Sequence, residues 1–274
     1  MRTVHNSYGI TNSGTSYSLT GSASKPTIVL IHGLGLNRHI WEEYVPALSN
    51  HYQVLDFDLY GHGESAAPPV KPNLTVFSNQ LRDLLDHLDI NTCSIVGFSL
   101  GGMINRRFAM DHPTRLHALI ILNSPHERGA IAQQLVEERA TNTEAGGALA
   151  TIESTLERWF TPHFRGTHKN YLESIRKSVL ANEPISYAQC RQVLATGVLE
   201  LIRPTPPICT PTLIITCAND SGSAPAMAYA ISKEIAGSHV FIVPGLQHMG
   251  LVEQANTFIK PITDFLHEIY PPED

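Results

Sequence analysis

The five residues Gly97-Phe98-Ser99-Leu100-Gly101 constrain this chain more than any other segment, because they fit the G-x-S-x-G pattern in the surroundings it requires. An apolar, β-branched run at 93–96 precedes them, and a helical pattern follows at 102–110. A strand that turns sharply into a helix holds such a serine hydroxyl out at the end of a sheet. Flanking glycines are expected because a Cβ atom would clash where the chain folds back on itself. The pattern predicts a nucleophile at Ser99, against the alternative of an ordinary serine in a glycine-rich turn.

The composition and charge of the chain indicate which classes of binding partner to expect. The chain has 274 residues, 42% of them hydrophobic, and a net charge of −6 without a basic run, which argues against nucleic acid and anionic membranes. No stretch approaches the ~20 apolar residues of a membrane helix, and residues 1–8 lack the apolar core of a signal peptide. The four cysteines form no C-x-x-C pair. We therefore expect a cytoplasmic protein, monomeric or homo-oligomeric, that acts on a small molecule.

Short apolar runs alternate with helical patterns along most of the chain, which predicts an α/β fold with a mostly parallel, doubly wound sheet. Their continuous apolar character is typical of parallel strands that are covered on both faces. The expected strands are Thr27–Ile31, Gln53–Phe57, 93–96, Leu116–Leu122, 212–216 and 240–243, with a weaker edge hairpin near 3–8 and 15–19. The expected helices between them are 40–48, 77–88, Leu100–Asp111, 225–235 and Ala255–Ile269.

The alternation breaks between about Pro125 and Arg203, where four helical patterns follow one another without a convincing strand. These patterns cover 127–141, 149–160, 169–181 and 186–199, and a proline-rich segment then leads directly into a strand. We expect a helical lid at 125–204, inserted after the sixth strand and laid over the carboxyl end of the sheet. The core then consists of 1–124 and 205–274.

A serine hydroxyl is a weak nucleophile at neutral pH and needs an adjacent base. In this strand order an acid follows the serine along the chain, and a histidine comes last. His248 follows the last strand, and Asp220 follows the strand before it. Ser99, His248 and Asp220 are thus expected to attack, to transfer the proton and to orient the imidazole. A surface histidine and a turn aspartate are the alternatives, and Glu127 is a competing acid that we expect in the first turn of a lid helix.

A glycine-rich turn after the strand Thr27–Ile31 is the expected source of an oxyanion hole. The backbone N–H groups of Leu100, directly after the serine, and of Leu34, in this turn, would donate to the developing negative charge. His32 is expected to shape the turn rather than to act as a second base. The histidines lack metal-ligand spacing, and no cofactor motif is present, so neither a metal nor a cofactor is expected.

Taken together, His32-Gly33-Leu34-Gly35, Gly61-His62-Gly63-Glu64-Ser65, the motif around Ser99, Asp220 and His248 resemble the α/β-hydrolase superfamily in order and approximate spacing over nearly the whole chain. Within it the chain is similar to 3-oxoadipate enol-lactonases. The lid segments Ala145-Gly146-Gly147 and Glu157-Arg158-Trp159-Phe160-Thr161-Pro162-His163-Phe164-Arg165 carry that likeness. That family has Ser-Asn where this chain has His32-Gly33, a pair found in generic esterases and C–C hydrolases.

The resemblance implies a serine hydrolase that cleaves an ester or lactone of a small molecule through an acyl-enzyme. Arg158 and Arg165 are candidates to bind a substrate carboxylate, and Trp159 is a candidate to wall the pocket. Solvated lid charges and a lid anchor are the respective alternatives. A C–C bond or amide hydrolase would use the same residues, and a non-catalytic small-molecule binder of this fold stays a rival. An intact set of three residues favours the enzyme.

Overall fold

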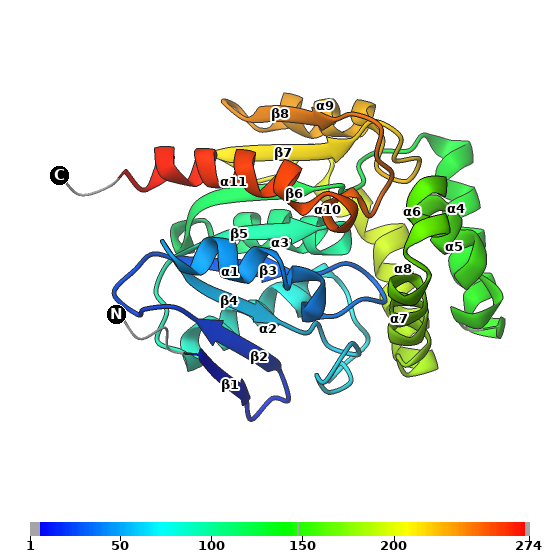
Figure 1. The fold of residues 1–274 in the computed structure, drawn as a ribbon, viewed down its shortest axis with the longest axis horizontal. Helices are drawn as coiled ribbons and strands as arrows, with labels where there is room; N and C mark the ends of the chain where they lie inside the picture. Colours follow the sequence, from blue (N-terminus) through cyan, green and yellow to red (C-terminus); the bar gives the residue numbers. More distant parts are fainter. Residues whose placement is uncertain (1–5, 147, 272–274) are drawn as a thin grey trace.

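The computed structural model describes residues 6–146 and 148–271, and the strands in these residues form one sheet. Its order is β1-β2-β4-β3-β5-β6-β7-β8. Strands β3 to β8 are parallel to one another, whereas β2 pairs antiparallel with both of its neighbours, β1 and β4. The strands are β1 (Asn6–Ile10), β2 (Ser16–Thr20), β3 (Thr27–Ile31), β4 (Gln53–Phe57), β5 (Cys93–Phe98), β6 (Leu116–Leu122), β7 (Thr212–Cys217) and β8 (His239–Val243). The prediction of a mostly parallel sheet is confirmed (Figure 1).

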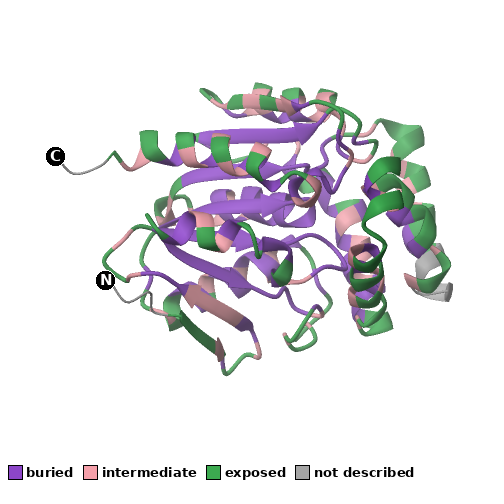
Figure 2. Cartoon of the chain, in the orientation of Figure 1, coloured by how far each residue is buried: buried purple, intermediate pink, exposed green. Residues whose placement is uncertain are grey.

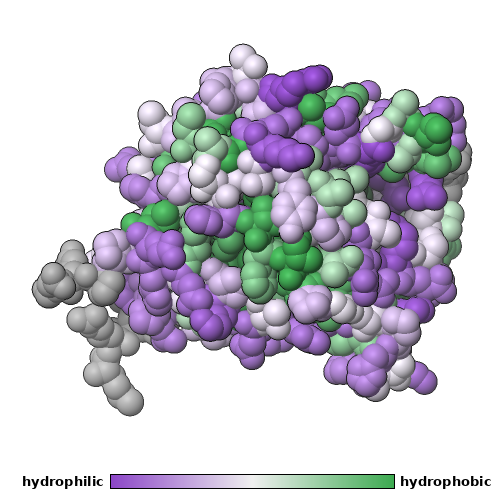
Figure 3. All heavy atoms as spheres, turned by 90° about the horizontal axis from the view of Figure 1, so that it is seen from above, coloured by the Kyte–Doolittle hydropathy of each residue, from purple (hydrophilic) through white to green (hydrophobic). Residues whose placement is uncertain are grey.

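The edge hairpin predicted near 3–8 and 15–19 is present as β1 and β2, one to three residues further along the chain. Residues 3–5 of that prediction lie outside the described residues. At the other edge, β8 is only half covered, whereas every residue of β3, β4, β5 and β7 is buried. Figure 3 looks down on the β8 side and shows apolar side chains in the middle of that face with polar groups around them.

Helices cover both faces of the sheet, which explains why its central strands are continuous apolar runs (Figure 2). Figure 1 shows α1 (Tyr44–Ser49) and α11 (Ala255–Ile269) on one face. The other face carries α2 (Leu74–His87), α3 (Leu100–Asp111) and α9 (Pro225–Glu234). The single helix expected at 40–48 is instead a 3₁₀ turn, Arg38–Trp41, followed by α1. Pro46 lacks an N–H and is tolerated in a first turn, so the helix has to begin shortly before it.

Between β6 and β7, the sixth and seventh strands along the chain, lie α4 (Ala130–Gly146), α5 (Ile152–Trp159), α6 (Pro162–Thr167), α7 (Lys169–Leu180) and α8 (Pro184–Thr196). They gather at the end of the sheet, as the lid prediction requires (Figure 1). The limits 125 and 204 of a separate lid unit stay a prediction, and Gly147 lies outside the described residues. None of the helices in the described ranges is long and apolar enough to cross a lipid bilayer.

Helix α6 was missing from the four expected lid helices. Its start is encoded locally, because the Thr161 hydroxyl accepts a hydrogen bond from the Phe164 N–H at 3.2 Å and Pro162 occupies the first turn. Helix α8 begins in the same way, two residues before the expected start. The Glu183 carboxylate accepts from the backbone N–H groups of Ile185 and Ser186. In both helices a capping residue followed by proline marks the first turn.

Candidate active site

The turn between β5 and α3 holds Ser99 in a conformation that few non-glycine residues adopt, with φ 55° and ψ −111°. A Cβ atom on Gly97 would lie inside van der Waals distance of the Gly101 carbonyl oxygen. One on Gly101 would collide in the same way with the carbonyl oxygen of Ile31 in β3. This turn, Gly97–Gly101, is called the elbow below. Its backbone packs directly against neighbouring backbone, which is the reason that glycine flanks the serine on both sides.

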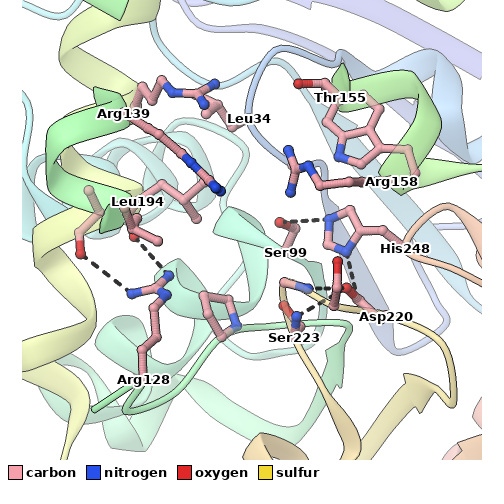
Figure 4. A pocket seen from close by; sticks show the side chains of 18 of the residues that line it. Leu34, Ser99, Arg128, Arg139, Thr155, Arg158, Leu194, Asp220, Ser223 and His248 are labelled. Atoms are coloured by element: carbon pink, nitrogen blue, oxygen red, sulfur yellow. Dashed lines mark hydrogen bonds and ion pairs between the residues drawn. The ribbon is translucent and has the colours of Figure 1, made fainter. Parts of the chain in front are cut away.

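The three residues predicted to act together meet at the carboxyl ends of β5, β7 and β8 (Figure 4). The Ser99 Oγ lies 3.2 Å from His248 Nε2, and His248 Nδ1 lies 2.6 Å from Asp220 Oδ2. All three side chains are buried, with Ser99 6% and His248 8% exposed. Residues 149 positions apart in sequence are therefore within hydrogen-bond distance in the orientation that general-base activation needs.

The carboxylate of Asp220 has several other donors. The Asn123 side-chain amide donates to Oδ2 at 2.8 Å, and the backbone N–H groups of Gly222 and Ser223 donate to Oδ1 at 2.8 and 3.0 Å. Burial would raise the pKa of Asp220, but the interaction with His248 and these hydrogen bonds lower it below its usual value. Asp220 is therefore held ionised and fixed in direction. Asn123, directly after β6, escaped the sequence analysis, although a polar residue at the carboxyl end of an apolar strand is the signal for it.

The competing acid, Glu127, takes no part in this arrangement. Its side chain is exposed, and it lies three residues before α4 rather than in the first turn of a lid helix, where we expected it. The turn 123–129 leads the chain away from β6 before α4 starts. The neighbouring His126 is buried and pairs through Nε2 with Glu234 Oε2 at 3.0 Å.

The turn after β3 packs against the elbow. A Cβ atom on Gly33 would lie 3.2 Å from the Ser99 Cβ, so this turn and the serine share one corner. Leu34 lines the adjoining cavity, and no backbone hydrogen bond among the described residues uses its N–H. Leu100 is the first residue of α3, where an N–H has no acceptor within the helix. Both predicted donors are thus free to meet an oxyanion.

His32 supports this turn, as predicted. The Leu59 N–H donates to its Nε2 at 3.0 Å, so the proton is assigned to Nδ1, which donates to the Gly33 carbonyl oxygen at 2.8 Å. Burial lowers the pKa of His32 to about 4, which keeps the ring neutral near pH 7. A neutral ring can accept and donate at once, and both hydrogen bonds fix the backbone beside Leu34.

A cavity of about 480 Å³ adjoins Ser99 and His248, a size suited to a small molecule. Its floor comes from the strand ends and its roof from α4, α5 and α8 (Figure 4). Arg158 and Trp159 line it, as expected, and the Trp159 ring lies 6.1 Å from the His248 ring between centroids. The Trp159 carbonyl also accepts from the Met249 N–H at 2.8 Å, so this residue both walls the cavity and ties the lid to the core.

Arg165 does not line the cavity, contrary to its expected role beside substrate. It lies on α6, whose buried residue, Phe164, stacks on the rings of Phe160 and His168 instead of facing Ser99. Three other arginines do line the cavity, and the sequence analysis did not single them out: Arg128, Arg139 and Arg191. The position of Arg128 soon after β6 is a weak signal for it. Helical periodicity alone does not say which face of α4 or α8 meets the cavity.

Comparison with known proteins agrees with this geometry. Residues 26–151 match the family model described as alpha/beta hydrolase fold. The chain has the α/β-hydrolase fold. Two 3-oxoadipate enol-lactonases of Acinetobacter baylyi are similar to it at 26% identity over 89% of each chain and at 28% over 93% of each. A crystal structure of the enol-lactonase from Burkholderia xenovorans LB400 superposes with a TM-score of 0.85 at 29% identity, covering 95% of this chain and 99% of that one.

In residues 6–146 and 148–271 no group of three or more His, Cys, Asp or Glu side chains is placed to hold a metal ion. The two carboxylate and imidazole groups at the site, Asp220 and His248, are engaged with each other. The site therefore places the Ser99 hydroxyl beside the His248 imidazole, with the backbone N–H groups of Leu34 and Leu100 nearby.

Proposed function

We propose that the protein is a serine hydrolase that cleaves an ester or lactone bond of a small molecule, in the manner of a 3-oxoadipate enol-lactonase. The observation that carries the proposal is the continuous hydrogen-bonded series from Ser99 Oγ to His248 Nε2 and from His248 Nδ1 to Asp220 Oδ2, at 3.2 and 2.6 Å. The similarity to two enol-lactonases supports the choice of bond.

In the proposed reaction, Ser99 Oγ attacks the carbonyl carbon while His248 Nε2 takes its proton. The negative charge that develops on the carbonyl oxygen is met by the N–H groups of Leu34 and Leu100. His248 then gives the proton to the leaving alkoxide, which in a lactone stays on the same molecule. Water, deprotonated by His248, attacks the acyl-enzyme and releases a carboxylate and free Ser99. Asp220 stays ionised and stabilises the imidazolium that forms twice in each turnover.

A fluorophosphonate probe tests the nucleophile directly, because it reacts with an activated serine. We expect labelling of the wild type and of the matched control Ser124→Ala, and no labelling of Ser99→Ala. Ser124 is a suitable control because it is a buried serine next to the elbow whose hydroxyl donates to the Ser99 carbonyl and does not contact His248. Equal labelling of wild type and Ser99→Ala would rule out the serine mechanism.

A substrate panel then tests the bond. We expect hydrolysis of p-nitrophenyl acetate and of an enol-lactone that carries one carboxylate, and weaker hydrolysis of the matched amide. A faster reaction with a vinylogous diketone acid would assign the protein to the C–C hydrolases that share these residues. Binding without turnover, with Ser99 unlabelled, would identify a small-molecule binder.

We also propose a reducing compartment, the cytoplasm, as the place of action. The four cysteines, Cys93, Cys190, Cys209 and Cys217, are all free, and three of them are buried. Burial raises the pKa of the Cys93, Cys190 and Cys217 thiols to about 12, so they stay protonated and inert.

A further inference from the structure

The wall of the cavity is unusually positive for an acidic protein. Among the described residues that line it are four arginines, Arg128, Arg139, Arg158 and Arg191, and one carboxylate, Asp220. That carboxylate is already engaged with His248. The chain as a whole carries a net charge of −6, so the cluster runs against its overall charge balance. A concave site lined by one sign of charge attracts ligands of the opposite sign.

Arg158, at the end of lid helix α5, lies close to Ser99 and His248 (Figure 4). It makes no ion pair with a carboxylate in the described part of the chain. Desolvation lowers the pKa of Arg158, and repulsion by Arg191 and Arg139 lowers it further, against a weaker opposing effect of Asp220. The positive charge of Arg158 is thus disfavoured where it stands, and an anionic ligand beside it would stabilise it.

Arg128 lies across the cavity from His248 (Figure 4), and neutral groups hold it there. Its guanidinium donates to Gln133 Oε1 at 3.1 Å and makes longer hydrogen bonds to the carbonyl oxygens of Leu194 and Ala195 in α8. Desolvation lowers the pKa of Arg128, and the nearby Glu137 partly opposes this. Among the described residues no ion pair joins Glu137 to Arg128, and Glu137 Oε1 instead accepts a hydrogen bond from Gln133 at 2.7 Å. The positive charge of Arg128 is therefore oriented but not neutralised.

We propose that the cavity accepts a small ester or lactone that carries two carboxylates, which deepens the proposed hydrolase function and rests on it. One carboxylate meets Arg158 and Arg191 next to the reacting bond, and the other meets Arg128 at the α4–α8 wall. A guanidinium binds a carboxylate through two parallel hydrogen bonds, so separate arginines define separate carboxylate subsites. A single carboxylate would occupy one subsite and leave Arg128 facing an uncharged part of the substrate.

Three p-nitrophenyl esters of similar length test the proposal: p-nitrophenyl butyrate with no carboxylate, the monoester of glutaric acid with one, and the monoester of tricarballylic acid with two. In the wild type, kcat/KM should rise about 10-fold with each carboxylate. In Arg158→Gln and Arg191→Gln the ratio of the glutarate ester to the butyrate ester should fall about 10-fold. In Arg128→Gln the ratio of the tricarballylate ester to the glutarate ester should fall by a similar factor.

Two further variants guard against trivial effects. Arg128→Lys keeps the charge but loses the paired donors, so it should retain part of the preference for the second carboxylate even if Arg128→Gln folds poorly. Arg82→Gln is the matched control, because Arg82 is a half-exposed arginine of α2 that pairs with Asp83 outside the cavity. It should leave both ratios as in the wild type.

The proposal is overturned if the wild type cleaves the glutarate ester as well as the tricarballylate ester, or if Arg128→Gln leaves their ratio unchanged. A different result would contradict the proposed hydrolase function itself, namely ester turnover that persists in Ser99→Ala. Calorimetry of Ser99→Ala with the monoamides of tricarballylic and glutaric acid, which carry two carboxylates and one, measures the subsites without any chemistry. Tighter binding of the tricarballylic monoamide, weakened about 10-fold by Arg128→Gln, supports the second subsite. Equal affinities for the two monoamides contradict it.

Discussion

The two sides of the cavity are built in opposite ways. On the side of the strand ends, Ser99, His248 and Asp220 are hydrogen-bonded to one another, and Asp220 accepts three further hydrogen bonds. On the lid side, Arg158 and Arg191 face the same space without a carboxylate partner in the described residues. The first side is already organised for one reaction, whereas the second is complete only when a ligand supplies the missing charge. In the proposed function, the residues at the strand ends carry out the reaction, and the lid arginines select the substrate.

The two sides are nevertheless joined beside His248. The Gln247 side chain, next to His248, donates to the carbonyl oxygens of Glu157 and Arg158 at 3.1 and 3.2 Å. The Thr161 N–H and hydroxyl donate to Glu253 in α10 (Gly250–Glu253) at 2.7 and 2.6 Å. The end of α5 is therefore fixed to the loop that carries His248. These hydrogen bonds hold Arg158 and Trp159 beside His248.

Removal of the nucleophile should give the largest effect, because it disables the organised side alone. Ser99→Ala should lower kcat for p-nitrophenyl acetate by roughly 10⁵-fold. The substitution removes one oxygen and leaves the arginine wall intact, so the affinity for glutarate should stay within a factor of about two. Steady-state kinetics and calorimetry measure the two quantities. Turnover near the wild-type level in Ser99→Ala would contradict the division of labour between the two sides.

Replacement of the orienting acid should come next. Asp220→Asn keeps the shape of the side chain but removes the charge that stabilises the imidazolium, and kcat should fall about 10³- to 10⁴-fold. Glu127→Gln is the matched control, since Glu127 was the competing acid and its exposed side chain lies outside the hydrogen-bonded series. It should retain wild-type kcat. A larger loss in Glu127→Gln than in Asp220→Asn would reverse the assignment of the acid.

The organised side could be predicted from the sequence because its residues are marked locally. Ser99 follows β5 directly, Asp220 and His248 lie three and five residues after β7 and β8, and parallel strands bring their carboxyl ends to one edge. The glycines of the elbow add a steric requirement that only a tight strand–helix turn imposes. Strand positions followed from the same pattern, and the bounds of β3, β4 and β6 agree with the prediction.

The lid side could not be predicted in the same detail, because lid helices present a residue to the cavity only through tertiary packing. Helical periodicity identifies a face of α8 but not the neighbour that the face meets, so Arg191 was missed. Arg158 and Arg165 look equivalent in sequence, yet α5 directs the first into the cavity and α6 carries the second away. The break between α5 and α6 at Thr161 decides the difference, and two hydrogen bonds from Thr161 to Glu253 hold it against the core.

A change at the elbow should disturb the organised side through its backbone. Gly101→Ala would place a methyl group against the carbonyl oxygens of Ile31 and His32, which cannot move without disrupting β3, so we expect a loss of about 3 kcal/mol of stability. Gly166→Ala in α6 is the control, with no atom within 4 Å of the new Cβ. It should gain up to about 1 kcal/mol from helix propensity. Urea unfolding measures both, and equal effects would show that the elbow is not tightly packed.

Acid should loosen the oxyanion turn through His32. Because the folded-state pKa of about 4 lies below the unfolded value of 6.5, the unfolded chain binds more protons between these values, and stability falls as the pH drops through this window. The loss attributable to His32 should reach about 3 kcal/mol near pH 4. His32→Gln, whose amide oxygen can still accept from Leu59, should give a flatter profile of unfolding free energy against pH. Part of the slope should remain, since burial also lowers the pKa of His62 to about 3. Identical slopes in the two proteins would contradict a neutral His32 in the folded state.

The smallest predicted effect separates two arginines of the same lid segment. Arg158→Gln should raise the competitive inhibition constant of glutarate about 10-fold, which corresponds to about 1.4 kcal/mol, because one charge-assisted pair is lost. Arg165→Gln should leave that constant unchanged, since Arg165 does not line the cavity. Because the end of α5 is fixed to the His248 loop, kcat for p-nitrophenyl butyrate serves as an internal control for the position of the base. A rise in the inhibition constant with a proportional loss of that kcat would mean that Arg158 acts by holding the loop rather than by binding the carboxylate.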